Sequence, residues 1–222
     1  MKNLSSLFTL TEQFLRLEFR TQTALLTHAL FLGVSLFIFA VALPQGLVPP
    51  EYANAGVLWS TLFLSSSSLA GALFMRSPQH AFTESLLLCG LPPQLIFLAR
   101  SLTLFALMLV LVGMALPLLT LFSPVSHSTG LASLIAIILL ACASYACVAS
   151  LFSSLMAKER FSELLLPVLV LPITLPILIV CVKATTESFL GLAPQGLFFL
   201  LGYALVMIPA STLLSEYVIE ME

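Results

Sequence analysis

The residues that could carry out chemistry are few and lie far apart along the chain. The three histidines, His28, His80 and His127, form no H-E-x-x-H pair and so predict no zinc site. The chain has no Asp and no G-x-x-x-x-G-K-[ST] motif, which excludes an aspartyl protease and a P-loop ATPase. The cysteines form no C-x-x-C pair and are expected to pack as small apolar residues: Cys89, Cys142, Cys147 and Cys181. We therefore expect no catalytic residue, no metal site and an energy source in another protein.

One polar segment, Arg76 to Pro93, separates two long apolar runs. Its sequence, RSPQHAFTESLLLCGLPP, predicts a short helix with both ends marked. Ser77 can cap the first free backbone N–H groups, and Pro78 suits the first helical position. Gly90 can adopt the left-handed conformation that ends a helix. The segment is therefore expected to hold a helix in the connection between two apolar runs.

The two faces of this predicted helix differ in chemistry. Phe82 and Leu86 are four residues apart and share an apolar face, whereas His80 and Glu84 share a polar face. A motor protein could bind a short amphipathic helix between two membrane spans and transmit movement to those spans through it. We expect these side chains to contact such a partner.

The composition of the whole chain indicates that this helix connects segments embedded in a membrane. Of the 222 residues, 60% are hydrophobic and 8% are charged, whereas soluble domains carry about 25% charged residues. The net charge of −2 predicts no nucleic-acid partner. Six apolar runs are each long enough to cross a bilayer core of about 30 Å as a helix. They are expected near Ala24–Leu43, Ala53–Met75, Leu95–Phe122, Thr129–Met156, Leu164–Val182 and Pro194–Tyr217.

The basic residues predict the orientation of these spans. With the N-terminus inside, seven of them face the cytoplasm and only Lys183 lies outside. The seven are Lys2, Arg16, Arg20, Arg76, Arg100, Lys158 and Arg160. Both termini are therefore expected in the cytoplasm. The outer connections, near 44–52, 123–128 and 183–193, are short, so residues 1–222 are expected to form a single multi-pass transmembrane domain.

Residues 5–21 predict an amphipathic helix that lies on the membrane surface. Its polar stripe comprises Thr9, Glu12, Gln13, Arg16 and Arg20, and its apolar face comprises Leu7, Leu10, Phe14 and Leu17. Glu18 falls within the apolar face, where a charge needs a partner. That partner could be Arg76 or Arg100 from the next inner segment. Alternatively, the Glu18 carboxylate could extend to the lipid headgroups.

The fifth apolar run contains Pro167, Pro172 and Pro176. Each proline removes a helical hydrogen bond and crowds the carbonyl four residues earlier. Three prolines in ten residues predict a kinked or locally unwound helix that serves as a hinge, and Thr174 could satisfy freed backbone groups.

Small residues concentrate in two other spans, at 65–72 and 141–150. Small side chains let membrane helices approach closely. The two stretches therefore predict either packing within the bundle or association with a second copy of the chain.

Three stretches of this sequence resemble the CcmB-type permeases of the cytochrome c maturation system, which are membrane subunits of type-2-like ABC transporters. These stretches are RLEFR at Arg16–Arg20, ESLLLCGLPP at Glu84–Pro93, and LVLPITLPILI at Leu169–Ile179. The resemblance in length and span placement covers nearly the whole chain. The chain differs from the family pattern at 76–81, where it has RSPQHA in place of acidic residues and a Gly.

The resemblance implies an all-α ABC-2 type permease with six transmembrane helices after an N-terminal interfacial helix. It implies no enzymatic activity of the chain itself, because ATP would bind to a separate A-type ATPase subunit. Residues 77–88 would be the coupling helix in the groove of that ATPase, with Ser77, His80, Phe82, Glu84 and Leu86 as contact residues.

The resemblance also implies a complex in the cell inner membrane. Two copies of the permease would assemble with C- and D-type membrane subunits, with a haem chaperone as client. ATP hydrolysis would drive release of the haem-loaded chaperone, and haem would be cargo rather than a directly bound cofactor. An ABC-2 type permease that exports a lipid or a polysaccharide is the alternative.

Overall fold

The structure is a computed structural model that describes residues 2–21, 23–42, 49–75, 86, 90–122, 130–156 and 162–220. All regular elements in these ranges are α-helices, as the sequence predicts. They are α1 (Lys2–Thr21), α2 (Thr23–Ala42), α3 (Pro50–Met75), α5 (Pro93–Phe122), α6 (Leu131–Met156), α7 (Ser162–Phe189) and α8 (Gly196–Glu220). The fold is that of a helical membrane protein.

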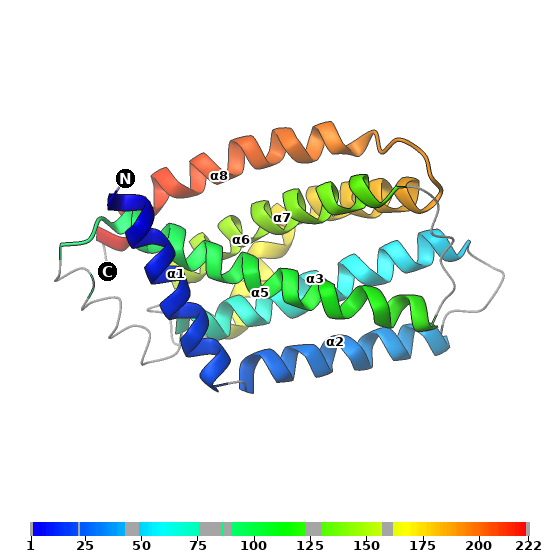
Figure 1. Cartoon of the computed structure of the whole chain (residues 1–222), viewed down its shortest axis with the longest axis horizontal. Coiled ribbons are helices and arrows are strands. Elements are labelled where there is room, and N and C mark those ends of the chain that lie inside the picture. Colours follow the sequence, from blue (N-terminus) through cyan, green and yellow to red (C-terminus); the bar gives the residue numbers. More distant parts are fainter. Residues whose placement is uncertain are drawn as a thin grey trace.

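The long helices α2, α3 and α5 to α8 run side by side, and α1 lies steeply across one end of this bundle (Figure 1). Both chain termini lie at the end that α1 covers, while α2, α5 and α7 finish at the opposite end (Figure 1). We call the end beside α1 the α1 end and the other the distal end. The predicted inner and outer ends of the spans are thus separated in space.

Five of the described helices contain a stretch that is long and apolar enough to cross a membrane. These stretches are Leu25–Ala42, Pro93–Leu121, Leu131–Met156, Val168–Phe189 and Gly196–Tyr217. The other long helix, α3, holds the predicted second span, but Glu51, Asn54 and four consecutive serines lower its hydropathy. At a rise of about 1.5 Å per residue, the 26 residues of α3 still extend about 39 Å.

One predicted boundary is wrong. The fifth span was expected to end at Val182, with Lys183 in an outer connection, but α7 continues to Phe189. The added turns are stabilised by tertiary contacts, because Thr185 and Thr186 are buried and Thr185 accepts a hydrogen bond from Trp59. Lys183 therefore lies on the exposed side of a helix. The helix ends at Phe189, and Gly191, two residues later, has the left-handed φ of 72° that follows many helix ends.

The core of the bundle forms around α3 and α6. Trp59 and Tyr145 are the largest fully buried side chains, and Phe63 packs edge-to-face against both rings. All residues of Ala141–Ser150 except Ala143 are buried within this single chain. That stretch packs inside the bundle, so the alternative that it associates with a second copy is wrong.

Candidate functional site

A small apolar cluster at the α1 end is separate from the main core. Leu10 and Phe14 of α1 are buried against Leu95 and Ala99 of α5. The predicted face of α1 is correct in part, since Thr9, Glu12, Gln13 and Arg16 are exposed, as is Leu17 at 42%. Leu17 is exposed because α5 covers only part of the apolar face. The cluster fixes α1 to the beginning of α5.

The end of the predicted coupling segment joins this cluster. Leu86 and Leu91 are partly buried against it, and the Leu91 N–H donates to the Leu86 carbonyl at 3.4 Å. Gly90 has a φ of 77°, which confirms the predicted left-handed stop. The chain that leaves the coupling segment is therefore anchored to both α1 and α5.

The other predicted coupling residues, Ser77, His80, Phe82 and Glu84, lie outside the described residues. Leu86 is described, and the structure places it against the chain's own α1 and α5. Sequence reasoning gave Leu86 only a partner-facing role. Its intramolecular contact was missed because the pattern does not show that α1 folds back over α5.

The predicted charge cluster is partly described. Glu18 is 3% exposed, which agrees with its predicted place on the apolar face and contradicts extension of its carboxylate to the headgroups. The guanidinium carbon of Arg100 lies 5.9 Å from the centroid of the Phe14 ring, a cation–π contact between α5 and α1. Arg76 lies outside the described residues. Glu18 and Arg100 each have an interaction partner, and their mutual pairing stays a prediction.

The proline-rich helix α7 is helical throughout, so local unwinding is not observed. Its N-terminal part, in yellow, takes a different direction from its orange C-terminal part (Figure 1). Pro172 and Pro176 are exposed. The Thr174 hydroxyl donates to the Val170 and Leu171 carbonyls at 2.9 and 3.3 Å. It does not reach the carbonyls of residues 168 and 172, which the prolines deprive of their helical donors.

A residue that sequence reasoning missed lies beside this bend. The Tyr203 hydroxyl of α8 donates to the Ile173 carbonyl of α7 at 3.1 Å. The helical donor to that carbonyl would be residue 177, next to Pro176, where the proline ring distorts the helix. Tyr203 thus supplies a hydrogen bond from a neighbouring helix at the proline bend. The available signal was a tyrosine within an apolar run, because a buried hydroxyl usually finds a partner.

The distal half of α7 is held to its neighbours by side-chain hydrogen bonds and close helix contacts. Trp59 Nε1 of α3 donates to Thr185 Oγ1 at 2.8 Å, and Ser188 Oγ donates to the Gly130 carbonyl at 3.0 Å. A Cβ at Gly130 would lie 2.7 Å from the Ser188 carbonyl, and one at Gly196 would lie 2.8 Å from Val180 Cγ1. These close approaches fix α7 against α3, the start of α6 and the start of α8.

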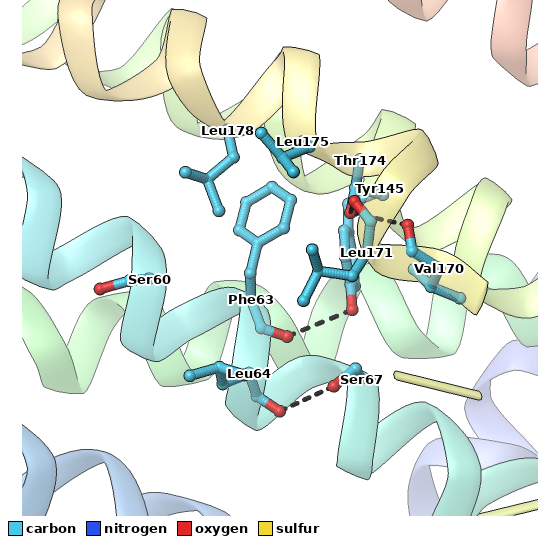
Figure 2. Close-up of a pocket in the computed structure, with 10 residues that line it drawn as sticks. All are labelled: Ser60, Phe63, Leu64, Ser67, Tyr145, Val170, Leu171, Thr174, Leu175 and Leu178. Carbon is cyan, nitrogen blue, oxygen red and sulfur yellow. Dashed lines mark hydrogen bonds between the residues drawn. The ribbon is translucent and has the colours of Figure 1, made fainter. Parts of the chain in front are cut away.

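A cavity of about 200 Å³ lies between α3, α6 and α7, beside the proline bend. Its lining is Ser60, Phe63, Leu64, Ser67, Tyr145, Val170, Leu171, Thr174, Leu175 and Leu178. Figure 2 shows the Phe63 ring pointing towards Leu175 and Leu178. The lining hydroxyls are engaged with backbone carbonyls: Ser60 with Gly56, Ser67 with Leu64, Thr174 with Val170, and Tyr145 with Phe63. The surface of the cavity is therefore apolar.

The described residues offer little to a metal. They contain no group of three His, Cys, Asp or Glu side chains that could hold an ion. Of the residue types that commonly bind haem iron, which are His, Cys, Met and Tyr, the ten described residues that line the cavity include one, Tyr145, and its hydroxyl donates to the Phe63 carbonyl.

A comparison with protein-family models matches residues 5–219 to the model described as CcmB protein. No curated protein matches the chain. The family match covers most of α1, the predicted coupling segment and the five candidate spans together.

Proposed function

Because the chain belongs to the CcmB protein family, the family of haem exporter permease subunits of ABC transporters, we propose that it couples ATP hydrolysis to release of a haem-loaded chaperone. A separate A-type subunit hydrolyses the ATP. The permease converts the movement of that subunit into a change of its own helices. The observation that carries this proposal is the apolar cluster through which Leu86 and Leu91 join α1 to α5.

Movement enters the permease through the coupling helix at 77–88. Ser77, His80, Phe82 and Glu84 contact the groove of the ATPase, and Leu86 belongs to the same helix. Since Leu86 and Leu91 pack on α1 and α5, a displacement of the coupling helix shifts both elements together. The Arg100–Phe14 contact and a pairing of Glu18 with Arg100 or Arg76 strengthen the same connection.

Movement reaches the bundle core through α7. The bend at Pro172 and Pro176 lets one part of α7 change its angle while the distal part stays fixed, and Pro167 extends the flexible region towards the α1 end. The exposed prolines and the Tyr203–Ile173 hydrogen bond support this role. No catalytic group of the permease takes part, and haem is handled as cargo.

The membrane arrangement that we propose rests on the same family assignment. α3 serves as a sixth span, since it is 26 residues long and lies among the other long helices (Figure 1). α1 lies in the headgroup layer, with both termini in the cytoplasm and the complex in the cell inner membrane. Two copies of the chain assemble with the ATPase, with C- and D-type membrane subunits and with the haem chaperone.

A charge on the apolar face of the coupling helix tests the proposal. Phe82→Asp should abolish co-purification of the ATPase, because a carboxylate cannot enter an apolar groove without a large desolvation cost. Phe82→Leu is the matched control and should retain the ATPase. If Phe82→Asp binds the ATPase as well as the native chain does, the coupling assignment is wrong.

A further inference from the structure

The cavity between α3, α6 and α7 borders the bend of α7 and is large enough to hold a ligand. Its volume of about 200 Å³ exceeds that of an engineered protein cavity of about 150 Å³ that binds benzene. Its four hydroxyl side chains already donate to backbone carbonyls. A polar ligand would give up hydrogen bonds to water and find no free donor there. An apolar ligand has no such hydrogen bonds to give up.

The position of the cavity in the bundle limits which apolar ligand can reach it. Phe63, Tyr145 and Leu175 lie near the middles of α3, α6 and α7. In a bilayer whose hydrocarbon core is about 30 Å thick, the middle of a span is about 15 Å from either surface. Headgroups do not reach this depth, but the ends of acyl chains do.

The cavity is open on the side that faces the surrounding lipid. Leu64, Leu171 and Leu175 line it and are 52%, 47% and 43% exposed. These leucines form an apolar mouth between α3 and α7. A cavity with an apolar mouth at this depth is in direct contact with acyl chains.

We propose that the cavity binds the terminal part of a bilayer phospholipid acyl chain. The chain enters between Leu64 and Leu171 and packs on the Phe63 ring, filling the space beside the bend of α7. A helix about 10 Å in diameter is too wide for the cavity. A second copy of the protein could only lie across the mouth and cover the exposed leucines. The proposal does not depend on the transported cargo, but it rests on the proposed placement of α3 as a membrane span, which sets the depth of the cavity.

The chain contains a natural reporter for this site. Trp59 is its only tryptophan and is fully buried, and its ring centroid lies 5.9 Å from that of Phe63. Bromine atoms quench indole fluorescence only at short range. A brominated acyl chain inside the cavity should therefore quench Trp59, while chains in the surrounding bilayer are kept away by the bundle.

The experiment uses the full chain reconstituted in phosphatidylcholine vesicles with dibrominated acyl chains. The closing variant Leu171→Phe/Leu175→Phe narrows the mouth. The matched control Leu201→Phe/Leu205→Phe introduces the same spacing of rings on the exposed face of α8. We expect at least twofold less quenching in the closing variant than in the native chain, and unchanged quenching in the control.

Two outcomes overturn the proposal. Equal quenching in the native chain and the closing variant would mean that bromine reaches Trp59 by another route. No quenching in the native chain would mean that the mouth is covered, as a second copy would cover it, or that the cavity stays empty. If the α7 variant fails to fold, Leu64→Phe narrows the mouth from α3 and is judged by the same criterion.

Discussion

The two parts of α7 are held to the bundle in different ways. The distal part is fixed by hydrogen bonds of Thr185 to Trp59 and of Ser188 to Gly130, and by the close approach of Gly196. The proline-containing part has exposed prolines, borders a cavity, and is joined to α8 through the bond from Tyr203 to Ile173. A helix that is fixed at one end and interrupted in the middle can change its angle at the interruption. In the mechanism proposed above, the distal part is the support and the proline-containing part is the element that moves.

The neighbouring helix α6 shows a similar contrast. Toward the distal end, Ser133 Oγ hydrogen-bonds to Ser188 Oγ at 2.8 Å. Toward the α1 end, Ser150 Oγ and Ser153 Oγ are buried without a hydrogen-bond partner. A buried hydroxyl without a partner costs about 1–3 kcal/mol. Among the described residues, the buried hydroxyls without a partner are these two, and both lie toward the α1 end.

The largest effect on the free energy of unfolding is expected where Trp59 holds the distal part of α7. Trp59→Ala removes the bond to Thr185 and leaves a cavity in the core, which should cost about 3–5 kcal/mol of unfolding free energy. Trp59→Phe keeps most of the packing and should cost only about 1 kcal/mol, the value of the lost hydrogen bond. Unfolding of the detergent-purified protein measures both. Equal, small losses would show that the distal half is not a rigid support.

Replacing the prolines at the bend of α7 is expected to change the unfolding temperature little but to lower function strongly. Pro172→Ala/Pro176→Ala restores two backbone N–H donors and should straighten α7. The unfolding temperature should stay the same or rise, while cytochrome c maturation by the complex falls. Pro209→Ala, at a proline inside α8, is the matched control and should leave maturation unchanged. Parallel loss of folded protein and maturation would show that the prolines only shape the bundle.

The smallest effect is expected at Tyr203. Tyr203→Phe removes the bond to the Ile173 carbonyl and should cost about 0.6 kcal/mol, a typical value between membrane helices. If this bond compensates for the distortion at Pro176, the cost should shrink in a Pro176→Ala background. A double-mutant cycle of unfolding free energies measures the coupling. Strict additivity would contradict a compensating role.

The sequence was sufficient for features that depend on local chemistry. The apolar runs predicted the long helices. The glycine at position 90 predicted the left-handed backbone found there, and the helical period predicted that Glu18 lies on the buried face of α1. Each of these follows from a few neighbouring residues.

Features that depend on contacts between distant segments were not predicted. The extension of α7 to Phe189 includes Thr185, whose hydrogen-bond partner, Trp59, is 126 residues away in the sequence. The packing of Leu86 on α1, the Tyr203 bond and the cavity each join helices that are far apart in the sequence. Periodicity gives the face of a helix but not the helix that it meets. The predicted contacts of Ser77, His80, Phe82 and Glu84 stay predictions, because those residues lie outside the described part of the chain.

The central claim is that this chain is the permease subunit of an ABC transporter and transmits movement of the ATPase to its own membrane helices. Purification of the intact complex tests this claim most directly. The complex should be extracted in a gentle detergent and its components identified by mass spectrometry. We predict an ATPase together with haem-handling membrane subunits. An ATPase without those subunits would contradict the proposed role in haem handling. The absence of any ATPase, with the permease folded and monodisperse, would contradict the claim itself.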